Sequence, residues 1–98
     1  MKITIIKDDQ AVYENGVAVM GIDLSDLPVD LHALQWDGNV GHIEWKTVTT
    51  PNQSVSSESE IDSALGISLT AIREKRTARI AEIEAELKAQ AEAQAENG

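Results

Sequence analysis

Two histidines and one glutamate are the side chains whose types and spacing come nearest to a metal site. His32 and His42 fall on opposite arms of one predicted hairpin, and Glu44 follows His42 on the same strand face. Imidazole nitrogens and carboxylate oxygens bind catalytic zinc, so a metal-dependent hydrolase is one hypothesis for this chain. The pattern includes no partner that would orient the imidazoles, and paired surface histidines are common. We therefore expect no metal.

Other catalytic motifs are missing from the sequence. The chain has no Cys, which excludes thiolate ligands, Cys nucleophiles and disulfides together. It has neither a Gly-rich loop followed by Lys-Ser/Thr nor a Gly-x-Ser-x-Gly segment. Asp8 and Asp9 fall at a predicted turn, and the glutamates of the C-terminal part have no matching base. We expect no catalytic residues, no cofactor and no enzymatic activity.

Charge is distributed unevenly along the 98 residues, whose net charge is −9. Residues 1–67 hold three Lys against eleven Asp and Glu, a balance of −8, whereas residues 68–98 hold five basic and six acidic groups, a balance of −1. An acidic surface repels phosphate backbones, which argues against a nucleic-acid partner. No segment approaches the roughly 18 apolar residues of a membrane helix, so we expect no membrane partner either.

The pattern of residues 1–46 predicts a β-rich domain. Asn15-Gly16 lies between two apolar segments and is typical of a type I′ hairpin turn. Leu24 and Leu27 are expected to turn inward from the loop that follows. The predicted strands are Lys2–Lys7, Gln10–Glu14, Val17–Ile22, Leu31–Trp36 and His42–Trp45.

The last two of these strands form a second predicted hairpin. Alternation along its first arm places Leu34 and Trp36 on the same side as His32. In its second arm, Ile43 and Trp45 share a side.

The chain then becomes polar and afterwards helical. Residues 47–59 are predicted to be a linker that joins two parts only through a tether. Residues 60–98 are predicted to form a helical segment. Ser57, just before it, and Glu60 fit a capping box for a short helix ending at Gly66. A long helix is predicted over about residues 69–95, a rod of roughly 40 Å. The fold class is therefore α+β: a small antiparallel meander of about four to five strands with two hairpins, then a short and a long helix.

The long helix carries an apolar stripe with an eleven-residue repeat, which favours a straight or slightly right-handed bundle. Packing against a partner helix or a second copy is favoured over docking on its own domain, because the stripe is narrow and long. The apolar stripe consists of Leu69, Ile72, Arg76, Ile80, Ile83 and Leu87.

The charges of the long helix oppose its macrodipole. Basic residues from Arg73 to Arg79 crowd its N-terminal third, and glutamates from Glu82 onward fill the rest. An antiparallel partner would set the basic third against an acidic end. The pattern thus favours an antiparallel or heterologous helix contact over a parallel homo-oligomer, although a solvated charge run is the simpler interpretation.

The segment LHALQWDGNVGHIEW resembles a group of small tailed-bacteriophage proteins, over about residues 1–46. The likeness lies in a Gln-Trp, Gly, Ile-Glu-Trp pattern after a short hairpin, and the C-terminal half departs from it. The residues that carry it are His32, Ala33, Gln35, Trp36, Gly38, Gly41, Ile43, Glu44 and Trp45.

This resemblance implies a tail-fibre assembly chaperone or a minor tail component, acting in the host cytoplasm during assembly or staying in the virion tail. Its partner would be a tail or tail-fibre protein. The partner-binding residues would be Trp36, Trp45, Gln35, Glu44 and His32, although the same tryptophans could simply be core. A cytoplasmic adaptor that oligomerises through its helix is the alternative.

Overall fold

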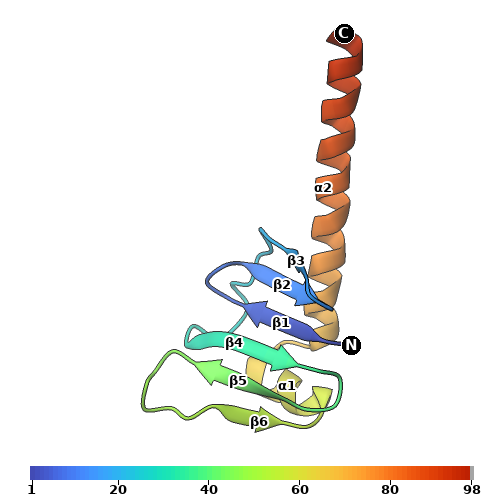
Figure 1. The fold of residues 1–98 in the computed structure, drawn as a ribbon. Coiled ribbons are helices and arrows are strands. Elements are labelled where there is room, and N and C mark those ends of the chain that lie inside the picture. Colours follow the sequence, from blue (N-terminus) through green and yellow to red (C-terminus); the bar gives the residue numbers. More distant parts are fainter. Residues whose placement is uncertain (98) are drawn as a thin grey trace.

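The computed structural model describes the backbone of residues 1–97 and the side chains of residues 1–95. An antiparallel sheet is followed by a short helix and a long C-terminal helix, which confirms the predicted α+β class (Figure 1). The elements are β1 (Ile3–Ile6), β2 (Ala11–Glu14), β3 (Val17–Val19), β4 (Leu31–Trp36), β5 (Gly41–Trp45), β6 (Gln53–Val55), α1 (Glu58–Leu65) and α2 (Leu69–Asn97).

The sheet has six strands in the order β3-β2-β1-β4-β5-β6, and every neighbouring pair is antiparallel. Strand β4 pairs with β1 rather than with β3, so two three-stranded meanders join at the centre of the sheet. The connection between β3 and β4 buries Leu24 and Leu27, which confirms their predicted inward position.

The β2–β3 hairpin turns where the sequence predicts. Asn15 and Gly16 have φ values of 49° and 84°, the two positive angles that a type I′ turn requires. The Asn15 side chain also accepts a hydrogen bond from the backbone N–H of Lys2 at 3.0 Å, which joins this turn to the start of β1.

One face of the sheet is covered by α1 and by the first turns of α2. Ile61 and Leu65 of α1 and Leu69 and Ile72 of α2 are buried in the same apolar cluster as the side chains of the sheet. The opposite face of the sheet, which we call the open face, has no helix over it (Figure 1).

The segment predicted to be a polar linker is part of this body. Residues 47–59 contain β6, which pairs with β5, and Val55 of β6 is buried in the core. The prediction that the β-rich and helical parts meet only through a tether is therefore wrong. Pairing with β5 orders a short Gln-Ser-Val segment that has no apolar alternation of its own.

A bulge in β4 overturns part of the predicted alternation. Leu31 pairs with Trp45 but Ala33 pairs with Glu44, so His32 is the extra residue between them. His32 is consequently exposed, whereas Leu34 and Trp36, predicted to share its side, are buried.

Both helices begin at a serine whose hydroxyl caps the first turn. The Ser57 hydroxyl accepts a hydrogen bond from the Glu60 N–H, and α1 ends at Gly66 in the left-handed conformation, as predicted. Glu60 completes the cap by accepting from the backbone N–H of Ser56 rather than of Ser57. The Ser68 hydroxyl accepts from the Ala71 N–H at the start of α2. Within residues 1–97, neither helix combines the length and the apolar character needed to cross a membrane.

Candidate interaction surfaces

The predicted partner-binding residues of the β part separate onto different sides of the sheet. Trp36 is buried in the core and Trp45 packs partly buried against it, so the tryptophans form no exposed patch. Gln35 and Glu44 lie on the open face, where Gln35 is exposed and Glu44 half-buried. His32 stands apart at the bulge. The structure thus favours the core interpretation of the tryptophans and leaves Gln35 and Glu44 accessible.

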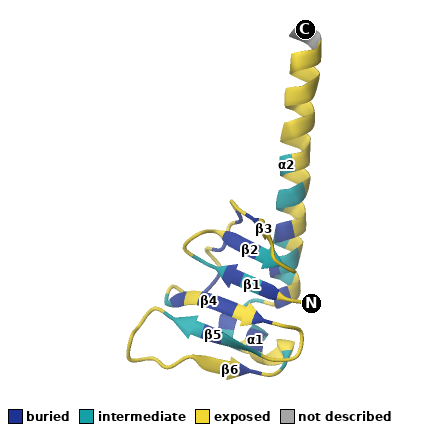
Figure 2. Ribbon diagram, in the orientation of Figure 1, coloured by how far each residue is buried: buried dark blue, intermediate teal, exposed yellow. Residues whose placement is uncertain are grey.

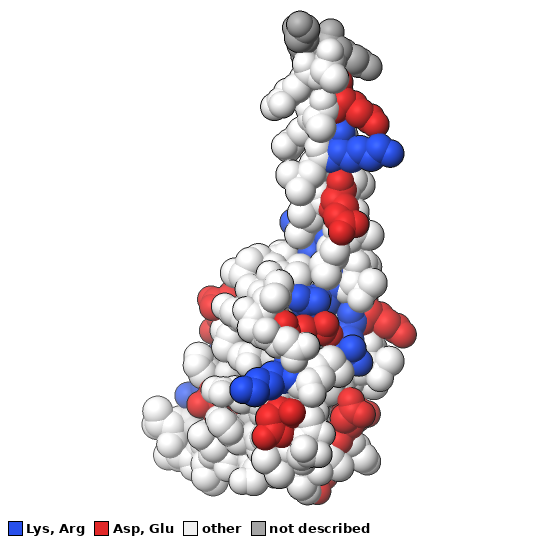
Figure 3. All heavy atoms as spheres, turned by 45° about the vertical axis from the view of Figure 1, so that its right-hand side comes forward, with Lys and Arg blue, Asp and Glu red and all other residues white. Residues whose placement is uncertain are grey.

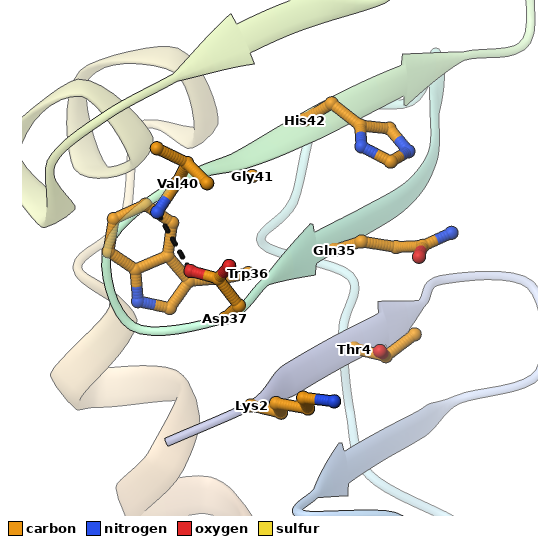
Figure 4. A pocket seen from close by; sticks show the side chains of 8 residues that line it. All are labelled: Lys2, Thr4, Gln35, Trp36, Asp37, Val40, Gly41 and His42. Atoms are coloured by element: carbon orange, nitrogen blue, oxygen red, sulfur yellow. Dashed lines mark hydrogen bonds between the residues drawn. The ribbon is translucent and has the colours of Figure 1, made fainter.

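A row of polar side chains crosses the open face. Strand register places Thr4 beside both Tyr13 and Gln35, Gln35 beside His42, and His42 beside Ser54. Figure 4 shows the Thr4, Gln35 and His42 side chains extending in the same direction from three neighbouring strands. Sequence alternation could have located Thr4 and Tyr13, but only the pairing of β4 with β1 brings them next to Gln35.

A shallow hollow of about 340 Å³ is lined by Thr4, Gln35 and His42 of this row. Lys2 and His42 contribute basic groups to it, and Asp37 contributes a carboxylate (Figure 4). The Asp37 carboxylate accepts hydrogen bonds from the backbone N–H groups of Val40 and Asn39, both at 2.8 Å, and these bonds lower its pKa below the ordinary 3.8. The Asp37 carboxylate thus stabilises the β4–β5 turn. The lining groups include no nucleophile with an adjacent base.

The structure does not assemble the two-histidine, one-glutamate set. His42 lies opposite Gln35 rather than His32, and its Nε2 is 3.8 Å from Glu44 Oε1. His32 instead lies near Asp8, whose pKa it helps to lower after the larger effect of a hydrogen bond from Lys46. Among the described side chains, those of residues 1–95, no three His, Cys, Asp or Glu are grouped to hold a metal ion.

The basic third of α2 contacts one carboxylate of the sheet, that of Glu14. Arg73 Nε donates to one carboxylate oxygen of Glu14 at 2.8 Å, and Arg76 Nη1 donates to the other at 3.2 Å. Arg76 also donates to the carbonyl oxygens of Val12 and Val17, and only 8% of its surface is exposed. The reversed charge order of the helix therefore has an intramolecular cause, since these arginines bind to the sheet of their own chain.

Two further basic residues of α2 bind the connection after β3. Lys75 Nζ donates to the Asp26 carboxylate at 2.8 Å and to the Asp23 carbonyl oxygen at 2.9 Å. Arg79 Nε donates to the Met20 carbonyl oxygen at 3.2 Å. A side chain at Gly21, where φ is 73°, would press on this guanidinium. The sequence identifies these basic residues but not their partners, because the contacts span about fifty or more positions of the chain.

The apolar stripe of α2 is divided by this docking. Leu69, Ile72 and Arg76 are buried, which corrects the prediction that the whole stripe packs on a partner helix. Ile80 and Ile83 are half-buried against the core cluster, and Leu87 is 59% exposed. Only the end of the stripe is left for another molecule.

Beyond Ile83 the helix leaves the body of the protein. Every residue from 84 to 95 is exposed, and we call this stretch the projecting segment (Figure 2). Figure 3 shows it with acidic and basic groups along one side and uncharged atoms along the other. An unpacked helix of this length is marginal in water, so the projecting segment is a surface suited to being covered.

Comparisons of the chain with family models, curated proteins and solved structures found no match.

Proposed function

We propose that this protein is a non-enzymatic protein-interaction protein of a tailed bacteriophage, acting as a tail-fibre assembly chaperone or as a minor tail component. The sheet and α1 form a body, and α2 extends from that body as the element that contacts a tail or fibre protein. The sequence resemblance over residues 1–46 supports the phage assignment, and the shape of the helix supports the mode of action.

The observation that carries the proposal is the exposure of Leu87 on the projecting segment. Leu87 continues a stripe whose earlier members are buried or half-buried, yet 59% of its surface is exposed. Covering a leucine side chain contributes roughly 1.5 kcal/mol or more to association. A helix presented in this way matches the helix-in-groove mode of protein recognition.

Most residues of the phage-like pattern have a structural role in the β4–β5 hairpin. Trp36 and Ile43 are core residues, Gly38 has a φ of 106°, and Gly41 lies against the backbone of β4. Much of the pattern therefore specifies the β4–β5 hairpin. Gln35 and Glu44 are the accessible polar residues of the pattern, and they would form a second contact with the partner on the open face.

The test is co-expression of the full chain with tail and tail-fibre proteins from the same phage genome. We expect one of them to copurify in a defined ratio, and Leu87→Gln to weaken the complex. Val48→Gln is the matched control, because Val48 is 99% exposed on a loop of the body and far from α2 in sequence. Absence of the protein from both fibre complexes and virions would count against the proposal.

A further inference from the structure

The projecting segment is acidic, and most of the basic groups of α2 are bound to the body. Arg73, Lys75 and Arg76 are bound to the sheet and its connections. The projecting segment, residues 84–95, holds three Glu and one Lys, a balance of −2. Arg79, in the preceding turn, contacts Glu82 at 3.0 Å and Glu86 at 3.7 Å.

The acidic groups lie beside the exposed end of the stripe. Glu84 follows Ile83 and Glu86 precedes Leu87, so at about 100° per residue they fall on opposite sides of the stripe. Glu92 comes nine residues after Ile83 and falls on the far side of the helix. A helix covering Leu87 would therefore have a carboxylate on each flank.

A second copy of this chain is a poor occupant. An antiparallel dimer would need the basic third of one helix against the acidic end of the other, but that basic third is docked on its own sheet. Pairing the projecting segments alone would set glutamates beside glutamates in proteins of net charge −9. The charge arrangement thus disfavours an antiparallel contact between identical chains and favours the heterologous contact, the other of the two that the sequence pattern favoured.

We propose that the projecting segment, together with the adjoining Ile83, binds a basic amphipathic helix of a different protein, with an apolar seam over Ile83 and Leu87 and Lys or Arg beside Glu84 and Glu86. One turn earlier along α2, Arg79 donates to the carbonyl oxygen of Met20, whose own surface is half exposed. This inference rests on the proposed function and names the chemistry of the partner.

The experiment uses two synthetic helical peptides of about 20 residues with one apolar Leu/Ala seam, flanked in one by Lys and Arg and in the other by Glu. Each is titrated into the full chain by fluorescence anisotropy at low and at physiological salt. The basic peptide is expected to bind at least about tenfold more tightly than the acidic one, with an affinity that falls as salt rises.

Two charge reversals separate a specific contact from general attraction. Glu84→Lys and Glu92→Lys change the net charge equally and lie on the same exposed helix, but only Glu84 flanks the stripe. Glu84→Lys and Leu87→Gln are each expected to weaken binding several-fold or more, whereas Glu92→Lys has a much smaller effect. Equal losses for the two reversals would overturn the proposal, because attraction would then depend on net charge alone.

Two other outcomes contradict it: the first leaves the proposed function intact, and the second leaves the phage assignment intact but overturns the proposed contact through α2. Concentration-dependent dimers that Leu87→Gln abolishes, measured by light scattering, would identify a second copy as the occupant. A tail or fibre protein that binds equally well to wild type, Glu84→Lys and Leu87→Gln would place the contact elsewhere on the molecule. Failure to find any tail or fibre partner concerns the proposed function instead.

Discussion

Arg76 on α2 and Glu14 on β2 form a partly buried ion pair, with Nη1 and Oε2 separated by 3.2 Å. The pair joins residues that are 62 positions apart and holds the long helix against the edge region of the sheet. Because Arg73 binds the second oxygen of the same carboxylate, Glu14 is the common anchor for two turns of α2. The helix is thus docked by charge as well as by the apolar contacts of Leu69 and Ile72.

Replacement of Glu14 should therefore loosen α2 from the sheet. Glu14→Gln leaves the Arg76 guanidinium largely buried without its counter-charge, and we expect a loss of about 1–3 kcal/mol in the free energy of unfolding. Urea denaturation followed by circular dichroism measures the change. Glu74→Gln, an exposed change on the same helix, is the control and should be nearly neutral. Equal effects of the two variants would show that the Glu14 pairs contribute nothing to stability.

Gly41 should tolerate no side chain. A Cβ at this position would overlap the Gln35 carbonyl oxygen and lie 2.9 Å from Trp36 Cα, so the β4–β5 hairpin would have to open. We expect Gly41→Ala to cost about 3 kcal/mol or to prevent folding. The comparison is Gly16→Ala, where nothing lies within 4 Å and only the φ of 84° opposes the change. Its cost should be about 1 kcal/mol, and thermal denaturation of both variants would rank them.

Local sequence patterns predicted some features of the fold and missed others. The type I′ turn at Asn15-Gly16, the helix cap at Ser57 and the end at Gly66 are local features, and each was predicted. Strand β6 depends on pairing with β5, and the bulge at His32 depends on the register between β4 and β5. Neither leaves a periodic apolar signal in its own segment.

The candidate surfaces divide in the same way. The apolar stripe of α2 can be predicted from sequence spacing. How much of the stripe stays exposed depends on where α2 docks, and that is set by the ion pairs of Arg73 and Arg76 with Glu14. The tryptophans of the phage-like pattern could equally be core or surface from the sequence, because large apolar residues occupy both kinds of site. Only the three-dimensional arrangement places them in the core and leaves Gln35 on the open face.

The Asp37 turn should make stability depend on acid pH. Backbone hydrogen bonds from Val40 and Asn39 lower the Asp37 pKa below 3.8, so the charged carboxylate is favoured in the folded protein. The sign follows from this direction: the contribution is present above about pH 4 and is lost as the pH falls through the lower, folded-state pKa.

Comparison of wild type with Asp37→Asn isolates this contribution, because asparagine keeps an acceptor oxygen but has no charge to titrate. Urea denaturation at a series of pH values should show wild type as the more stable form near pH 6. The difference should shrink steadily below about pH 4. A difference that stays constant across this range would mean that the charge of Asp37 does not strengthen the turn.

The division of α2 into a docked and a projecting part predicts opposite outcomes for two residues of one stripe. Ile72 is buried in the core, so Ile72→Ala removes packed methylene groups and should cost about 2–4 kcal/mol in the free energy of unfolding. Leu87 is more than half exposed and lies beyond the body, so Leu87→Ala should change that free energy by no more than about 0.5 kcal/mol.

Both values come from urea denaturation of the isolated protein at low concentration, with light scattering to establish that each variant is monomeric. A cost for Leu87→Ala close to that of Ile72→Ala would mean that residue 87 is already covered in the isolated protein. A Leu87→Ala effect that grows with protein concentration would mean that a second copy covers it.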